Sequence, residues 1–171
     1  MAILPLVKAP DPRLKLVSQP VEKVDAALRA FMADMVETMY DAKGIGLAAI
    51  QVGVPKRVVV IDLDPQGPES KVLYIVNPEL VWSSDEPNTY NEGCLSVPEF
   101  WDDVHRPAKI RVRYMDENNK TQEVEADGLF ATCLQHEIDH INGLLFIDHL
   151  SKLKRNMALR KSAKMKRLEE D

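Results

Sequence analysis

The sequence has little of what stabilises secreted or membrane proteins. Among its 171 residues there are two cysteines, Cys94 and Cys133, which lie far apart and are expected to be free thiols rather than a disulfide. No apolar run approaches the roughly 18 residues that a membrane-spanning helix needs. Residues 1–8 contain neither a basic leader nor a small-residue cleavage site. We therefore expect a cytoplasmic protein that does not enter a membrane.

Positive charge is also in the minority, with 22 lysine and arginine residues against 27 aspartate and glutamate residues and a formal net charge of -5. This balance by itself argues against a general nucleic-acid-binding protein, and we expect no DNA partner. A chain of this length can bury roughly 70% of its unfolded surface. We see no internal repeat or domain boundary, so we expect one catalytic domain over residues 1–171.

Histidine is scarce as well, with four in the chain, and two of them lie in the run His136-Glu137-Ile138-Asp139-His140. At about 100° per residue, a helix places these two imidazoles about 40° apart, close enough to share one metal ion. The alternative is a helix with two exposed histidines and no function. Catalytic metal sites of this kind use three protein ligands and leave one position open. Phe146 occupies the position where the long metalloprotease motif has its third histidine, so the third ligand must come from elsewhere.

Either cysteine is a possible third ligand. Cys94 is the leading candidate. Cys133 lies one turn before His136 on the same helix, and three ligands along one ridge of a straight helix cannot easily surround one metal ion. Cys133 is better placed, with Leu129, as the wall of a pocket beside the metal. Helix geometry leaves the catalytic base open, since Glu137 and Asp139 lie about 80° to either side of the metal direction.

The order of the predicted elements indicates an α+β fold. Residues 1–24 are rich in proline and are expected to be extended, and an amphipathic helix is predicted from Asp25, a plausible N-cap, to Lys43. β-branched and alternating stretches predict strands over residues 57–62, 72–81, 104–114 and 121–126. Because strands and helices do not alternate regularly, we expect antiparallel sheets packed around a central metal-binding helix.

Residues 44–51 hold two glycines and two alanines, so another group approaches this backbone closely. The simpler interpretation is a glycine helix cap followed by a tightly packed turn. Gln51 is the one polar side chain in this apolar stretch. It is either a satisfied buried amide or a positioned hydrogen-bond donor.

Three motifs together resemble the peptide deformylase family in order and spacing: GIGLAAIQ (44–51), EGCLS (92–96) and HEIDHING (136–143). The resemblance covers nearly the whole chain. It implies removal of the N-formyl group from the initiator methionine of new polypeptides, so the expected partners are N-formyl-Met peptides and nascent chains. It also implies that Cys94, His136 and His140 hold Fe(II), for which zinc, nickel or cobalt can substitute.

The resemblance implies further roles within the site. Glu137 corresponds to the catalytic glutamate, and its side chain is one methylene longer than that of Asp139. Asp139 is the better candidate for supporting a metal ligand or for a place on the helix surface. The Gln51 side chain and the Leu95 backbone N–H are expected to stabilise the oxyanion. Substrate backbone is expected near Ile45 and Gly46, and the methionine side chain near Leu129, Cys133 and the His136 ring edge.

The tail over residues 151–168 predicts a basic helix, with eight lysines and arginines and no acid before Glu169. It is either a solvated surface helix or, given where the family acts, a contact to ribosomal RNA. Trp101 contacts substrate beyond its methionine or covers the core, and we hypothesise that Arg106 pairs with Glu92. A general metallopeptidase and a non-catalytic, ribosome-associated metal protein are the rival functions.

Overall fold

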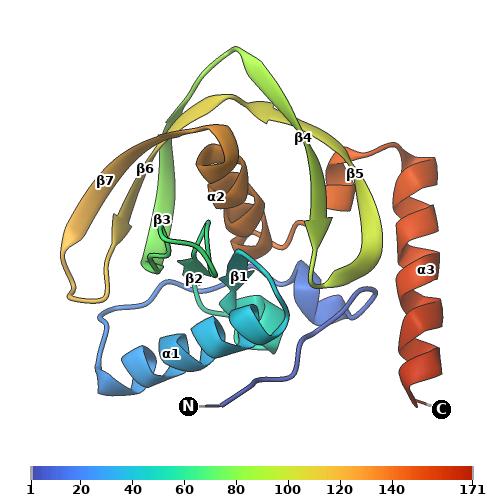
Figure 1. Ribbon diagram of the computed structural model, residues 1–171, viewed down its shortest axis with the longest axis horizontal. Helices are drawn as coiled ribbons and strands as arrows, with labels where there is room; N and C mark the ends of the chain where they lie inside the picture. The colour runs from blue at the N-terminus through green and yellow to red at the C-terminus, as the bar shows by residue number, and fades with distance from the viewer. Residues whose placement is uncertain (1, 171) are drawn as a thin grey trace.

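The computed structural model describes residues 2–170 and has an α+β fold (Figure 1). The three α-helices are α1 (Ala26–Asp41), α2 (Gly128–Ile141) and α3 (Lys152–Glu170). Short 3-10 helices are η1 (Pro12–Lys15), η2 (Ala49–Val52) and η3 (Phe146–His149). The strands are β1 (Gly46–Ala48), β2 (Val58–Ile61), β3 (Leu73–Ser83), β4 (Pro87–Cys94), β5 (Val97–Pro107), β6 (Lys109–Met115) and β7 (Thr121–Asp127).

The strands form two antiparallel sheets, a five-stranded sheet in the order β1-β2-β3-β6-β7 and the β4-β5 hairpin. Figure 1 shows α2 in the middle of the molecule, with the curved strands of both sheets around it. Leu134 and Ile141 of α2 share one apolar cluster with residues of β1, β2, β3, β6 and β7. This arrangement confirms the expected α+β fold with antiparallel sheets.

Strand β2 separates the two halves of the core. All four of its residues are buried, and alternate residues point to opposite faces. Val59 and Ile61 pack in the cluster of α2, whereas Val58 and Val60 pack in the cluster of α1. The second cluster contains three fully buried methionines of α1, Met32, Met35 and Met39. The methionine stripe is therefore core.

The first helix begins where the sequence predicts. The Asp25 carboxylate accepts a hydrogen bond from the Leu28 N–H at 2.8 Å, which caps the helix. The helix ends at Asp41, two residues before the predicted end. Lys43 adopts a left-handed backbone with φ of 60°, and Gly44 N–H bonds the Met39 carbonyl. The residue in the left-handed conformation is thus Lys43 and not the glycine.

The strand predictions were incomplete, and β1 and residues 97–103 of β5 were not predicted. Residues 104–114 are not one strand, because the chain leaves the β4-β5 hairpin at Pro107 and joins the five-stranded sheet at Lys109. Strand β4 was missed because most of its residues are polar, so it carries no apolar alternation. Cys94 is its last residue, which fixes the EGCLS motif to the end of a strand.

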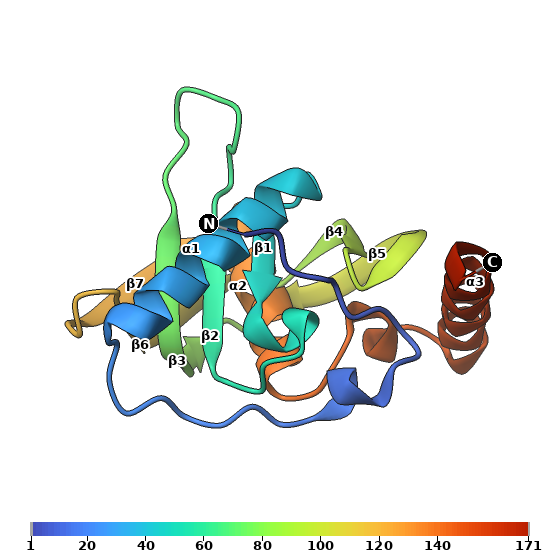
Figure 2. The same cartoon turned by 90° about the horizontal axis from the view of Figure 1, so that it is seen from below.

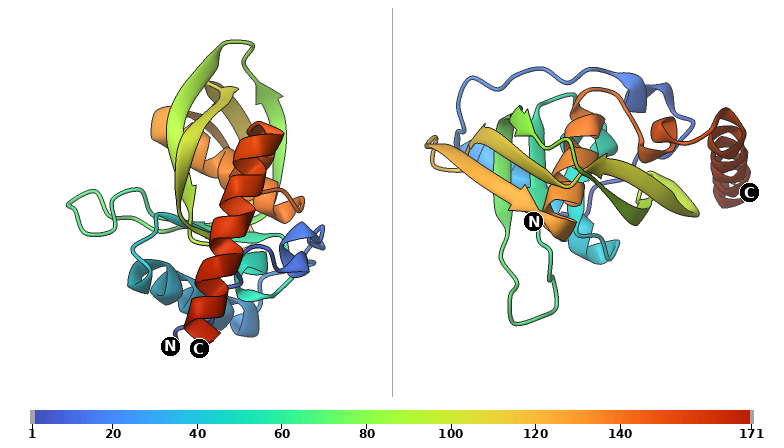
Figure 3. Two further views of the ribbon diagram at one scale, coloured as in Figure 1. Left: turned by 90° about the vertical axis from the view of Figure 1, so that its right-hand side faces the viewer. Right: turned by 90° about the horizontal axis from the view of Figure 1, so that it is seen from above.

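Helix α3 and the N-terminal arm pack against each other. Helix α3 stands at the edge of the molecule beside the β4-β5 hairpin (Figure 3), and its Ala158 packs with residues of the N-terminal arm and β5. It runs over Lys152–Glu170, against the predicted 151–168. The loop between β2 and β3 projects from the body (Figure 2). Within residues 2–170, no helix has the length and apolar character to cross a membrane.

Candidate active site

Helix α2 and strand β4 bring together the three predicted ligands. His136 and His140 lie one turn apart on α2, with ring centroids 5.0 Å apart. The Cys94 Sγ, at the end of β4, lies 3.3 Å from His140 Nε2. One ligand atom from each of the three residues lies within 4.8 Å of the other two. In the described part of the chain this cluster contains Cys94 and not Cys133.

The two cysteines have opposite electrostatic environments. Burial raises the pKa of the Cys94 thiol, but the charges and hydrogen bonds of His140 and His136 outweigh burial and hold that pKa well below its usual value. Burial and the charges of Glu137 and Glu92 raise the pKa of Cys133 well above its usual value. A thiolate is the form that binds metal. The site therefore favours Cys94 as a ligand and keeps Cys133 a neutral, apolar group.

Glu137 is the buried acid of the site. Its Oε1 lies 3.9 Å from His140 Nε2 and, among residues 2–170, makes no hydrogen bond. Burial raises the pKa of this carboxyl above its usual value, against the lowering effect of the two histidines. A carboxylate with a raised pKa and a free oxygen is suited to accept a proton. Asp139 points elsewhere and binds Arg106 and His149.

Gln51 supplies fixed donors to the cluster. Its Oε1 accepts a hydrogen bond from the Ala48 N–H at 2.9 Å, so its Nε2 is turned toward β4 and β5. Nε2 donates to Ser96 Oγ at 3.1 Å and to Cys94 Sγ at 3.6 Å. Leu95 and Ser96 form the turn of the β4-β5 hairpin, which places the Leu95 backbone at the same cavity. Gln51 is thus both a satisfied buried amide and a donor to the site.

A second layer of charges supports His136. Its Nδ1 donates to Glu92 Oε1 at 3.0 Å, which leaves Nε2 for the cluster. Arg106 donates to both oxygens of Glu92, at 2.7 and 3.0 Å, so the hypothesised pair is confirmed. The contacts of Glu92 to His136 and of His149 to Asp139 were not predicted from the sequence. No fixed spacing signals either contact, because each joins separate elements.

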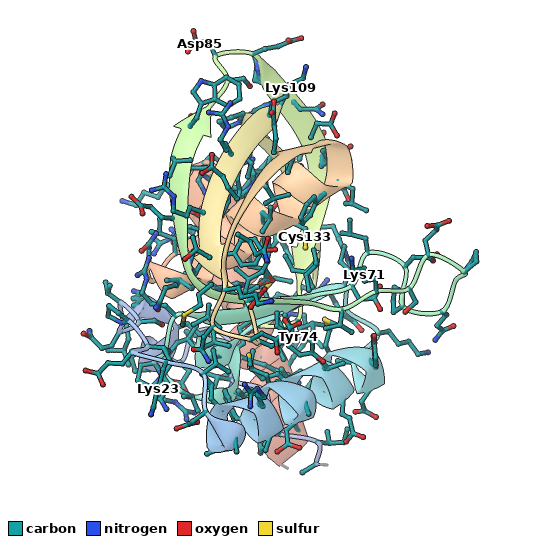
Figure 4. All side chains as sticks on the ribbon, turned by 90° about the vertical axis from the view of Figure 1, so that its left-hand side faces the viewer. Lys23, Lys71, Tyr74, Asp85, Lys109 and Cys133 are labelled. Atoms are coloured by element: carbon teal, nitrogen blue, oxygen red, sulfur yellow. The ribbon has the colours of Figure 1, made fainter. Side chains whose placement is uncertain are left out.

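A cavity of about 580 Å³ opens onto the cluster. It is lined by all but one of the predicted site residues: Ile45, Gly46, Gln51, Cys94, Leu95, Leu129, Cys133, His136 and Glu137. His140 is fully buried and does not line it. Figure 4 shows Cys133 in the interior, far from the Asp85 and Lys109 tip. Trp101 lines the cavity with 61% of its surface exposed.

The residues of the cluster fit a divalent metal ion. One thiolate and two imidazoles are donors that suit zinc, iron, cobalt or nickel. Glu137 Oε1 is buried and has no hydrogen-bond partner among the described residues. Leaving a buried acceptor unpaired costs free energy, so we expect a polar group to bind this oxygen in the functional state. The donor set alone does not select one of these metals.

Comparisons with known proteins show what this chain is similar to. The family model described as polypeptide deformylase matches residues 3–156. A peptide deformylase of Phenylobacterium zucineum is 58% identical over 164 residues, covering 96% of this chain and 97% of the relative. The crystal structure of a peptide deformylase from Legionella pneumophila matches with a TM-score of 0.92 and 48% identity, covering 98% of each chain. One from Ehrlichia chaffeensis in complex with actinonin matches with a TM-score of 0.92 and 44% identity, covering 98% of this chain and 99% of that one.

Proposed function

Because the chain belongs to the polypeptide deformylase family of hydrolases, we propose that it removes the N-formyl group from the formyl-methionine of newly made polypeptides in the cytoplasm. The observation that carries the proposal is the cluster itself, in which a thiolate from β4 meets two imidazoles beside the buried acid Glu137. The residues of this site come from β1 to α2, so we propose that residues 1–171 act as one catalytic domain.

We propose that Cys94, His136 and His140 hold the metal. When bound, such an ion would act as a Lewis acid and would lower the pKa of bound water to about 7. We assign Fe(II) from the family resemblance, with zinc, nickel or cobalt as substitutes. Glu92 supports the assignment, because its hydrogen bond to Nδ1 turns Nε2 of His136 toward the cluster.

Glu137 moves the protons of the reaction. It takes a proton from the water that attacks the formyl carbon, and it delivers a proton to the amine as the carbon–nitrogen bond breaks, so that formate and a free amino terminus are released. The pKa of Glu137 is raised, which makes the carboxylate a better proton acceptor. A group that both accepts and releases a proton works best when its pKa is near the working pH. Asp139 is a poor alternative, because Arg106 and His149 already bind its carboxylate.

The Gln51 amide and the Leu95 backbone N–H would stabilise the oxygen of the formyl group as it gains negative charge. A donor of this kind is typically worth about 10²-fold to 10³-fold in rate. The Gln51 side chain is held for this role from both ends, by Ala48 N–H and by Ser96 Oγ. Little reorganisation is then required at the moment of reaction.

The peptide would bind along β1. This strand is at the edge of the five-stranded sheet, so the backbone near Ile45 and Gly46 is available for pairing with an extended substrate. Leu129, Cys133 and the His136 ring edge line the same cavity and would receive the methionine side chain. Cys133 suits an apolar pocket because its raised pKa keeps it neutral.

One assay tests the proposal. Anaerobically prepared, iron-loaded protein should release formate from formyl-Met peptides and should not act on acetyl-Met or unblocked peptides. Glu137→Gln should retain its metal and lose turnover, whereas Cys94→Ala should lose the metal. Cleavage of unblocked peptides would favour a general metallopeptidase instead. Metal binding without any turnover would favour a non-catalytic metal protein.

We also propose that α3 contacts ribosomal RNA. Its Arg160, Lys164 and Arg167 line a surface groove and would meet phosphates. Lys154 and Arg155 are already paired with Asp102 and Asp148.

The double substitution Arg160→Glu and Lys164→Glu should weaken ribosome binding at low salt by more than Lys154→Glu. Equal binding by the two variants would contradict this contact. The substitutions leave the buried residues of the helix, Ala158 and Ser162, in place.

A further inference from the structure

The short helix η3 is connected to the predicted ligand His136 in two ways, one direct and one through other residues. Directly, the Phe146 ring stacks on the His136 imidazole, with centroids 6.0 Å apart and an angle of 22° between the planes. Indirectly, the His149 Nε2 lies 2.7 Å from Asp139 Oδ2. A carboxylate with a lowered pKa can only accept, so His149 donates from Nε2. The segment between α2 and α3 is therefore connected to the site.

The second route is a continuous chain of charge-assisted hydrogen bonds. Asp139 Oδ2, which accepts from His149, also accepts from Arg106 Nη1 at 2.8 Å. Arg106 Nη2 donates to Glu92 Oε1 at 3.0 Å, and that same oxygen accepts from His136 Nδ1 at 3.0 Å. Three residues, Asp139, Arg106 and Glu92, thus connect an imidazole at the surface to the imidazole of a predicted metal ligand.

Burial makes each member of this chain depend on its neighbours. The side chains of Arg106 and Glu92 are 5% exposed, that of Asp139 is 17% exposed, and that of His149 is 36% exposed. Burial raises the pKa of Glu92 and of Asp139, but hydrogen bonds from His136 and Arg106 to Glu92, and from His149 and Arg106 to Asp139, outweigh it and lower both values. Two carboxylates therefore face one guanidinium. Besides Arg106, Glu92 has the His136 N–H as a donor, and Asp139 has the His149 N–H.

We propose that His149 is a positioning residue for the metal site. By fixing the Asp139 carboxylate it holds Arg106 against Glu92, and Glu92 in turn holds the His136 ring with Nε2 toward the metal. The inference rests on the proposed ligand set. Loss of a group bonded directly to a ligand typically costs about 10-fold to 100-fold in metal affinity. His149 acts through three intervening residues, so its loss should cost about 3-fold to 10-fold.

The experiment compares Co(II) binding to three variants of the metal-free protein. His149→Met removes the donor, and His149→Gln keeps an N–H at a similar reach. His105→Met is the matched control, because His105 is also an exposed imidazole with one side-chain partner, Thr89 Oγ1. It neighbours Arg106 on β5 but lies on the opposite face of the strand. Co(II) dissociation constants from chelator competition and the thermal midpoint of each metal-free variant are measured.

His149→Met should bind Co(II) about 3-fold to 10-fold more weakly, with altered Co(II) absorption, while His149→Gln and His105→Met stay near the wild type. Unchanged affinity in His149→Met would overturn the proposal. An equal loss in His149→Gln would also overturn it, because packing and not the donor would then be responsible. If Cys94→Ala bound Co(II) as tightly as the wild type, the ligand set and the proposed function would fail first.

Discussion

The backbone of Gly46 lies directly against the carboxylate of Glu137. A β-carbon at position 46 would stand 2.7 Å from Glu137 Oε2 and 3.0 Å from Cys133 Sγ. Both neighbours are buried between β1 and α2. Position 46 of the GIGLAAIQ motif therefore has to be glycine, because a larger residue would collide with Glu137 of the HEIDHING motif.

Gly46→Ala should displace the Glu137 carboxylate and lower kcat by about 10-fold to 100-fold, since small misplacements of reacting groups are costly. Metal content should not change. Gly44→Ala is the matched control, because its β-carbon would meet only the movable end of the Leu95 side chain, and its loss should be much smaller. Steady-state kinetics on one formyl-Met peptide decide this, and an unchanged kcat in Gly46→Ala would contradict it.

Gln51→Glu should lower kcat by about 10²-fold to 10³-fold. The substitution keeps the acceptor for the Ala48 N–H but replaces the donor by a negative charge near Cys94. The expected loss is in turnover, so kinetics are paired with metal analysis of the same preparation. Retention of full activity would show that the Gln51 donor does not act on the developing charge.

Arg106→Ala should destabilise the fold and weaken metal retention. Removing one partner of a buried ion pair leaves an uncompensated charge, here on Glu92, at a cost of about 3–5 kcal/mol. Urea unfolding at neutral pH gives the change in the free energy of unfolding, and elemental analysis gives the metal content. A variant with full metal content and full activity would show that Arg106 does not support the cysteine and histidine cluster.

Acid should lower the stability of the metal-free protein through Glu92 and Asp139, the two carboxylates that bind Arg106. The pKa of Glu92 lies below its ordinary value of 4.5, and that of Asp139 below its ordinary value of 3.8. The stability they contribute is complete above those ordinary values and is lost as the pH falls through the lowered ones. The free energy of unfolding should thus decrease on acidification below about pH 4. Arg106→Ala should show a shallower decrease over that range, and an equal slope would contradict the assignment.

Trp101→Ala should change recognition beyond the methionine. The indole edge lies against Gly93, where no room remains for a β-carbon, and most of the ring is exposed beside the cavity. An aromatic contact is worth about 0.5–1.5 kcal/mol, so KM for formyl-Met tripeptides should rise roughly 2-fold to 10-fold. KM for formyl-methionine amide should not change. A lower thermal midpoint with unchanged KM would instead assign Trp101 to covering the core.

Local patterns in the sequence predicted much of the fold. The helical spacing in α1, the Asp25 cap and the paired histidines of α2 each depend on residues within one or two turns. The strands richest in valine and isoleucine were predicted for the same reason. Strand β4 and the break at Ala108 were not, because polar exposed residues carry no alternation and because a chain that changes sheets keeps its local pattern.

The sequence by itself determined that two imidazoles lie on one face of a helix and that this helix lacks a third ligand. Only the tertiary structure decided that the Cys94 thiol meets them, and that Glu137 faces the cluster while Arg106 and His149 bind Asp139. The reason is physical, since helix periodicity fixes the direction of a side chain on its own element. The group that it meets depends on how separate strands and helices pack.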